Sequence, residues 1–251
     1  MNEARTFGDF FSERMKKQEE EFKSWCEAND VEYSALDGEV RRKAHDAYYR
    51  SITEERNRLM QQLDEDNQKN RQESEDKRRW DNFVRTIPPI YRNASLDDFS
   101  DGLRKRIQPI LSGSSALILG ENGIGKTHMA WAILKDRFIA HKTVEYTKAQ
   151  LLLYDIKTKE NPYKYCKDKF GGLDFLVIDE VDKIFESKAD FVYLNFLIDH
   201  RYEWMKPTIV LGNGTKEQFI ASLGQSIYSR LRGNKGLDIT LTGKDKRFED
   251  G

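Results

Sequence analysis

Downstream of Trp80, short apolar runs alternate with segments of helical spacing. The apolar runs predict strands over residues 115–120, 143–147, 173–180, 207–213 and 236–242. The segments between them predict helices near residues 126–140, 147–157, 189–205 and 215–231. Such alternation favours a parallel sheet covered by helices on both faces, which binds its ligands at the carboxyl ends of the strands. We therefore expect the functional residues directly after the strands.

Upstream of Trp80 the apolar positions form only a narrow stripe at helical spacing. Its most prominent members are aromatic: Phe7, Phe10, Phe11, Phe22 and Trp25. The stripe breaks near Gly38 and resumes from Val40, but residues 61–79 carry almost nothing apolar, which predicts a solvated helix or a flexible tether. We predict a helical arm over residues 1–80 and a second domain over 81–251. A small bundle that only packs on the second domain is the alternative, but a narrow stripe on long charged helices favours docking to a partner.

Composition excludes several classes of protein. The net charge is −1, with 16 Lys and Arg against 20 Asp and Glu in residues 1–80, and therefore 26 against 23 in the remainder. Neither part is basic enough to indicate nucleic-acid binding from charge alone, so any such contact needs a local patch. Cys26 and Cys166 lie too far apart for a local zinc knuckle, and we expect free thiols in a reducing compartment. The sequence shows neither a secretory leader nor a membrane-spanning run, which predicts a cytoplasmic protein with no membrane partner.

The stretch GENGIGKTH follows the first predicted strand and opens the first predicted helix. It matches G-x-x-x-x-G-K-[ST], in which glycines let successive N–H groups face a phosphate, the lysine reaches the β- and γ-phosphates and the hydroxyl faces Mg²⁺. The predicted nucleotide contacts are Gly120, Glu121, Asn122, Gly123, Ile124, Gly125, Lys126, Thr127 and His128. The expected ligands are ATP and Mg²⁺.

Two further strands end in polar residues suited to the same site. The buried run 175–178 leads into Asp179, which we assign with Thr127 to the metal shell, and Glu180, which we assign as the general base. Asn213 ends the next strand, where its amide suits holding the attacking water or sensing the γ-phosphate. Asn213 followed by Gly214 is also ordinary turn chemistry, so the residues alone leave that role open.

Taken in order, five segments resemble the DnaC/IstB group of AAA+ ATPases, and within it the helicase loaders. The segments are IPPIYRNASLDDF, GENGIGKTHMAWAI, LVIDEVD, DHRYEWMKPTIVLGN and IYSRLRG. The resemblance covers roughly residues 83–247 and implies a five-stranded AAA+ core that hydrolyses ATP with Mg²⁺, slowly and under stimulation by partners. It matches Asn213 to the first sensor and Arg230 to an arginine finger that acts on a neighbouring subunit's ATP.

This chain departs from the group's pattern in two places. Leu211 and Gly212 stand where the group has Thr-Ser before the sensor asparagine, and the final segment lacks a serine near Arg247, which leaves that arginine without a clear role. We also expect no helical lid after the last strand, as in this group.

Lysines and aromatic residues interleave between the second and third predicted strands. They suit tracking a phosphate backbone and stacking on bases, which predicts a single-stranded DNA contact through Lys157, Tyr163, Lys164, Tyr165 and Lys167. The alternative is that the tyrosines pack on the sheet while the lysines remain solvated.

The resulting hypothesis is an ATP-driven loader that delivers a hexameric replicative helicase to single-stranded DNA. The arm is expected to grip the helicase through its aromatic residues, and the core to assemble into an ATP-dependent oligomer or spiral. One rival is an IstB-type transposition helper with a transposase as partner. The other is a nucleotide-gated adaptor with little hydrolysis.

Overall fold

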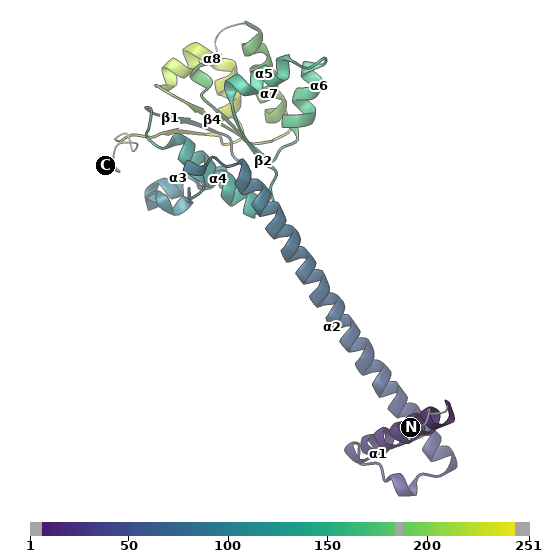
Figure 1. The fold of residues 1–251 in the computed structure, drawn as a ribbon. Coiled ribbons are helices and arrows are strands. Elements are labelled where there is room, and N and C mark those ends of the chain that lie inside the picture. The colour runs from purple at the N-terminus through teal and green to yellow at the C-terminus, as the bar shows by residue number, and fades with distance from the viewer. Residues whose placement is uncertain (1–6, 184–187, 244–251) are drawn as a thin grey trace, which may run out of the picture. The chain divides into compact units, whose positions relative to one another are not determined.

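The computed structural model describes residues 7–183 and 188–243. The chain divides into two compact units, Met1–Arg79 and Trp80–Gly251 (Figure 1). Within the described part, no helix combines the length and the apolar content needed to cross a bilayer. Arg247 lies outside these residues, as does most of the segment after the last predicted strand, where no helical lid was expected.

The second unit is built on a parallel sheet of five strands, which confirms the predicted fold class. The strands are β1 (Ala116–Leu119), β2 (Val144–Lys148), β3 (Phe175–Asp179), β4 (Thr208–Gly212) and β5 (Leu237–Thr240). Their order in space is β2-β3-β4-β1-β5, and every neighbouring pair is parallel. The chain therefore crosses over the sheet between successive strands, and the carboxyl ends of all five strands meet at one edge.

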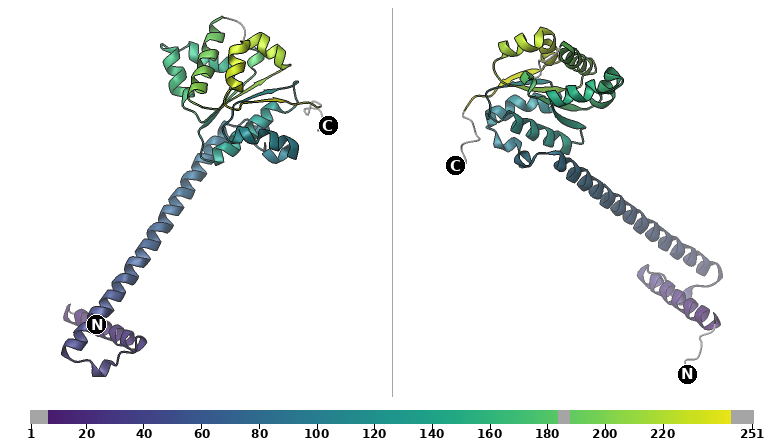
Figure 2. Two further views of the ribbon diagram at one scale, coloured as in Figure 1. Left: turned by 180° about the vertical axis from the view of Figure 1, so that it is seen from behind. Right: turned by 45° about the horizontal axis from the view of Figure 1, so that its top comes forward.

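Helices cover both faces of this sheet (Figures 1 and 2). One face carries α3 (Asp101–Leu111) and α4 (Lys126–Ile139). The other carries α5 (Ala149–Lys157), α6 (Pro162–Cys166), α7 (Lys188–Glu203) and α8 (Lys216–Arg232). Side chains alternate along β1, so Ala116 and Ile118 join the core under α4 while Leu117 and Leu119 join the core under α7 and α8. Burial on both faces explains why the central strands are continuous apolar runs.

Helix α8 departs from the single helix predicted near residues 215–231. Gly224 interrupts it with φ 82° and ψ 155°, values outside the helical region. A side chain there would be strained by the positive φ and would lie 3.6 Å from the ring of Phe191. The interruption separates the capped first half, which begins at the Thr215–Gln218 capping box, from the half that carries Arg230.

The first unit holds a small aromatic cluster between two helices, α1 (Phe7–Ala28) and α2 (Gly38–Thr86). Phe22 stacks on His45 with ring centroids 3.8 Å apart, and Cys26 and Tyr48 are buried beside it. Phe22 is 0% exposed because its ring packs inside the arm's own core. The prediction that Phe22 anchors a partner is therefore wrong. The side chains of Phe7, Phe10 and Phe11 lie outside the described residues.

The sequence allowed either a solvated helix or a flexible tether over the polar residues 61–79. In the structure, helix α2 continues through them. Ile52, Leu59, Met60 and Leu63 are exposed along it. Its last turns belong to the second unit, where Phe83 stacks on Phe138 with centroids 4.0 Å apart. The aromatic residues near the end of α2 thus tie this helix into the core under α4.

A buried arginine ties α7 to the amino-terminal edge of the sheet. Arg201 is 0% exposed and donates to Thr208 Oγ1 at 2.9 Å, to Pro207 O at 2.6 Å and to Leu173 O at 3.0 Å. It also donates to the carbonyl of Phe170. Burial lowers the pKa of this guanidinium to about 10, which still leaves it charged at neutral pH. Sequence analysis did not identify this contact, because an arginine on a helix is ordinarily exposed.

We predict that Arg201→Met destabilises the core unit. The substitution leaves three buried carbonyl groups without their donor, which costs about 3 kcal/mol, and thermal unfolding should shift down by about 10 °C. The matched control is Arg106→Met on α3, where the side chain is exposed and the melting temperature should stay unchanged. Equal melting temperatures for the two variants would contradict the role given to Arg201.

Candidate nucleotide-binding site

The loop between β1 and α4 has the backbone that a phosphate-binding loop requires. Gly120, Gly123 and Gly125 have positive φ values of 154°, 76° and 98°. A Cβ on Gly120 would come within 2.6 Å of the carbonyl oxygen of Leu241, so that position accepts only glycine. The first turn of α4 holds no acidic residue and its N-cap is Gly125, so no side chain caps the first N–H groups of the helix. An anion is therefore favoured at this helix end.

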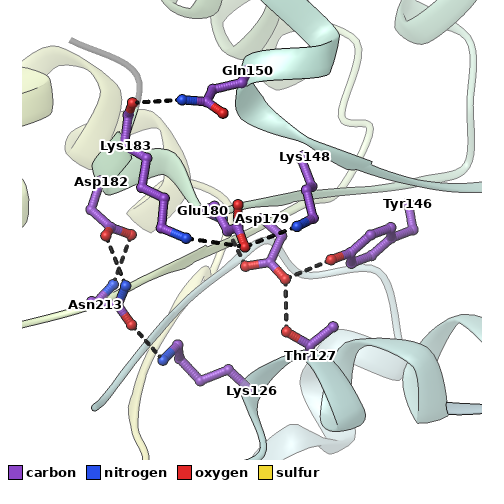
Figure 3. Close-up of polar contacts among 10 residues, drawn as sticks. All are labelled: Lys126, Thr127, Tyr146, Lys148, Gln150, Asp179, Glu180, Asp182, Lys183 and Asn213. Carbon is purple, nitrogen blue, oxygen red and sulfur yellow. Dashed lines mark hydrogen bonds and ion pairs between the residues drawn. The ribbon is translucent and has the colours of Figure 1, made fainter. Parts of the chain in front are cut away.

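Lys126 folds back over the loop that precedes it. Its Nζ donates to Gly120 O at 2.9 Å, to Glu121 O at 2.7 Å and to Asn213 Oδ1 at 2.9 Å (Figure 3). The side chain is only 8% exposed, so these acceptors offset the loss of water around the ammonium. The contact with Asn213 joins the end of β4 to the phosphate loop, as the predicted site requires.

The carboxylate of Asp179 lies beside the hydroxyl of Thr127. Asp179 Oδ2 accepts hydrogen bonds from Thr127 Oγ1 at 2.8 Å and from Tyr146 OH at 2.7 Å, while Oδ1 accepts from the backbone N–H of Glu180 at 2.7 Å (Figure 3). A hydroxyl and a carboxylate side by side are hard oxygen donors, and they fit Mg²⁺. Tyr146 was missed by the sequence analysis, since nothing in a strand pattern says which side chain reaches across to the next strand.

Glu180 follows directly after β3 in a left-handed conformation, with φ 59°. Its carboxylate pairs with Lys148 Nζ at 3.0 Å and with Lys183 Nζ at 3.2 Å. Partial burial raises the pKa of this carboxyl, but the hydrogen bonds and charges of the two lysines outweigh burial and lower the pKa overall. Glu180 is therefore ionised at neutral pH, as a proton acceptor must be.

Asn213 is held by both of its polar atoms. While Oδ1 accepts from Lys126, Nδ2 donates to Asp182 Oδ2 at 2.8 Å, and the backbone N–H donates to Asp182 Oδ1 at 3.0 Å. These bonds fix which way the amide points, so that its oxygen faces the phosphate loop. Asp182 is a second residue that sequence analysis did not single out, although it lies three residues after Asp179.

A cavity of about 700 Å³ lies above this cluster. Its lining includes six of the nine predicted nucleotide contacts: Asn122, Gly123, Gly125, Lys126, Thr127 and His128. The other three support the loop from below, since Ile124 is buried in the core and the carbonyl groups of Gly120 and Glu121 hold Lys126. A cavity of this size suits a nucleotide.

One side of the cavity is apolar and was not predicted as part of the site. It is lined by Ile90, Tyr91 and Phe99, which come from the 3₁₀ turn Pro89–Tyr91 and from the residue after the turn Leu96–Asp98. His128 Nε2 lies 2.6 Å from Asp98 Oδ2, and this contact lowers the pKa of the Asp98 carboxyl. The 87–99 stretch thus supplies apolar surface next to the phosphate loop, which suits the flat face of a base.

Comparison with known proteins assigns this core. Residues 110–229 match the family described as IstB-like ATP binding protein. The replicative helicase loader DnaC of Escherichia coli K12 is 28% identical over 161 residues, which cover 58% of this chain and 66% of that protein, just under two thirds of its length. The matched part of this core is therefore similar in sequence to IstB-like ATP-binding proteins and to the helicase loader DnaC.

Solved structures have the same fold. A crystal structure of the DnaC helicase loader superposes with a TM-score of 0.54 and 19% identity, over 62% of this chain and 100% of that one. A crystal structure of DnaI superposes with a TM-score of 0.55 and 18% identity, over 64% and 95% of the two chains. The AAA+ architecture implied by the sequence resemblance is confirmed.

Arg230 does not line the cavity of this ATP-binding domain. It pairs with Asp199 on α7, and its NH1 donates to Ser226 Oγ at 2.7 Å and to Ser226 O at 3.2 Å. The matched family residues end one position before it. Its predicted action on a neighbouring subunit's nucleotide therefore stays a prediction, with Asp199 as its partner inside one chain.

The five predicted DNA-contacting residues of the domain divide into two groups. Lys157 pairs with the buried Asp190 at 2.6 Å, and Tyr165 OH donates to Asp155 Oδ2 at 2.5 Å, so these two side chains support the fold. Lys164 and Lys167 are exposed, and Tyr163 is 45% exposed with its ring against Phe196. Lys157 is exposed as well, with 41% of its side chain accessible, but its ammonium is engaged by Asp190.

We predict that Lys126→Ala removes nucleotide binding while the fold persists. The variant loses the cation that faces the phosphates, so the rise in melting temperature that ATP with Mg²⁺ gives the parent chain should disappear. The control Lys105→Ala removes an exposed lysine of α3 and should keep the full rise. A rise of equal size in both variants would contradict the assignment of Lys126.

Proposed function

We propose that this protein is an ATP-dependent loader that binds a ring-shaped hexameric replicative helicase and delivers it to single-stranded DNA at the start of replication. One observation carries the proposal: the chain is 28% identical to the helicase loader DnaC over 161 residues, and its residues 110–229, which match the IstB-like ATP binding family, hold the Lys126–Asn213 and Thr127–Asp179 contacts of a nucleotide site. The helical arm, which precedes the matched family residues, gives this ATP-binding domain a separate element for a partner.

Nucleotide hydrolysis in this proposal uses the residues gathered at the carboxyl edge of the sheet. Lys126 and the loop N–H groups bind the phosphates, and Thr127 with Asp179 would hold Mg²⁺, which supplies charge neutralisation at the β- and γ-phosphates. Glu180 accepts a proton from the attacking water, and Asn213 orients that water. Arg230 acts on the nucleotide of an adjacent copy, which makes hydrolysis depend on self-assembly.

The arm grips the helicase through exposed apolar side chains of α2. Ile52, Leu59 and Leu63 lie seven and four residues apart, which places them on one side of the helix, and Met60 flanks them. The aromatic cluster around Phe22 is closed, so we assign the partner to this exposed stripe; α2 also exposes Val40 and Tyr49, nearer its start. A helix with a short apolar stripe suits docking into a groove on another protein.

Single-stranded DNA contacts the outer side of α6. Tyr163 presents a partly exposed ring for stacking, and Lys164 and Lys167 lie beside it for the phosphates. Lys157 and Tyr165 act indirectly in this proposal, by holding α5 and α6 in place. Nucleotide acts mainly as a switch: the ATP state favours the assembled form, and hydrolysis releases it.

Two rivals use the same nucleotide site. An IstB-type transposition helper would pair with a transposase and act on double-stranded DNA, a reading favoured by the description of the matched family. A nucleotide-gated adaptor would need ATP binding but little hydrolysis. The identity of the arm's partner separates the first rival from the loader, and the effect of removing hydrolysis separates the second.

We predict that charges on the apolar stripe of α2 abolish helicase capture. The full-length chain, immobilised and exposed to host lysate, should retain a replicative helicase. The amount retained should fall by tenfold or more in Leu59→Asp/Leu63→Asp, because a few apolar side chains that become buried on binding carry most of such a contact. Asn57→Asp/Gln68→Asp adds the same charge on another side of α2 and should retain the helicase. Bound proteins are identified by mass spectrometry. Capture of a transposase instead would favour the first rival.

We predict that Glu180→Gln retains ATP but hydrolyses it at least 100-fold more slowly, since the amide cannot accept the proton. Phosphate release measures the rate, and the ATP-induced rise in melting temperature reports binding. In the loader, this variant should capture the helicase and fail to release it. A variant that still loads helicase at the parental rate would make the protein an adaptor.

A further inference from the structure

We propose that Tyr146 is a positioning residue for the Mg²⁺ shell, which orients the Asp179 carboxylate through its hydroxyl and connects that carboxylate to the aromatic residues at the end of α2. The proposal rests on the magnesium-dependent ATP binding of the proposed function. It does not depend on which protein the arm binds.

Within residues 7–183 and 188–243, Asp179 accepts side-chain hydrogen bonds from two hydroxyl groups, and Tyr146 supplies one of them. The phenol lies 2.7 Å from Oδ2, and Thr127 Oγ1 lies 2.8 Å from the same oxygen. Thr127 is also the hydroxyl expected on the metal, so without Tyr146 the position of Oδ2 would change whenever that hydroxyl adjusts to its ligand, and only Oδ1 would keep its bond from the Glu180 N–H. The bond from Tyr146 comes from a different element and keeps Oδ2 in place. Hydrogen-bonded outer residues of this kind commonly control metal affinity.

The register of the sheet explains how this side chain reaches Asp179. In the parallel pair of β2 and β3, Tyr146 lies opposite Val177 and Lys148 lies opposite Asp179. A tyrosine two residues before the opposite position is long enough to bring its hydroxyl to the end of β3. Lys148 itself turns to Glu180, so the two carboxylates at the end of β3 are each held by a different residue of β2 (Figure 3).

The hydroxyl of Tyr146 remains a donor under all ordinary conditions. A tyrosine phenol keeps its proton at neutral pH, since its ordinary pKa is about 10. Its ring stacks on Trp131 of α4, with centroids 4.7 Å apart and planes 29° apart. A protonated phenol on a packed ring is a donor whose direction is preorganised, because few alternative rotamers are open to it.

Further contacts between aromatic rings lead from Trp131 to helix α2. Trp131 lies 6.4 Å from Phe83, and Phe83 stacks on Phe138, which lies 6.1 Å from Trp80. Trp80 and Phe83 belong to the last turns of α2, the helix whose earlier residues form part of the arm. If Asp179 shifts when the metal binds, we expect Tyr146 to shift with it, together with the rings that pack at the end of α2. Trp131 and Trp80, two of the four tryptophans of the chain, lie among these rings, so a change in tryptophan fluorescence is expected with such a shift.

The test uses Tyr146→Phe in the full-length chain, which keeps the ring on Trp131 and removes only the hydroxyl. Mg²⁺ is titrated into each protein with a fixed concentration of ATP, following both melting temperature and tryptophan fluorescence. We expect the half-saturating Mg²⁺ concentration to rise about tenfold in Tyr146→Phe, while the stabilisation by ATP in EDTA stays equal to that of the parent. Tyr154→Phe on α5, where the ring is 68% exposed, is the matched control and should titrate as the parent does.

Three outcomes would overturn the proposal. One is a parental Mg²⁺ response in Tyr146→Phe, and another is an equal loss of ATP stabilisation with and without Mg²⁺, which would make Tyr146 merely structural. The third is a parent chain that gains nothing from Mg²⁺. Failure of the helicase-capture experiment with the Mg²⁺ shift intact would remove the loader function and leave the role of Tyr146 standing.

Discussion

The parallel direction of the five strands is the constraint on which the rest of the structure depends. It brings every strand's carboxyl end to one edge, and the order β3-β4-β1 makes three informative strands neighbours there. Lys126 follows β1, Asp179 ends β3 and Asn213 follows β4, so residues distant in sequence meet at this edge. A change of strand order would separate Asn213 from Lys126 while leaving each local sequence intact.

Charge at this edge is balanced by contacts that a nucleotide can replace. Lys126 uses two backbone carbonyls and an amide oxygen as acceptors, and Glu180 uses Lys148 and Lys183 as counter-charges. Phosphate oxygens can compete with these three neutral acceptors of Lys126, because an ionised acceptor makes the stronger hydrogen bond with an ammonium group. The same reasoning separates the site from Arg201, whose buried bonds lie at the opposite edge and serve the fold.

The two units of the chain differ in how they use aromatic residues. In the first unit, Phe22, Trp25 and Tyr48 close a small cluster, which leaves the exposed aliphatic positions of α2 for partners. In the second, Trp80, Phe83 and Trp131 join the end of α2 to the core beneath α4. Helix α2 therefore participates in both units, and in the second unit the ring of Trp131 lies between its Phe83 and Tyr146.

The sequence by itself determined the five strands, the parallel sheet, the phosphate loop and the acid pair after β3, because burial on both faces and the glycines of the loop leave local signatures. It also marked Asn213, whose place at a strand end follows from chain order. Only the tertiary structure decided that Tyr146 and Lys148 hold Asp179 and Glu180, that Phe22 is closed inside the arm, and that Lys157 and Tyr165 support the fold. These facts depend on strand register and on which charged group lies opposite in space. Neither leaves a trace in the periodicity of a single chain, since each residue's partner lies about 10 to 33 positions away.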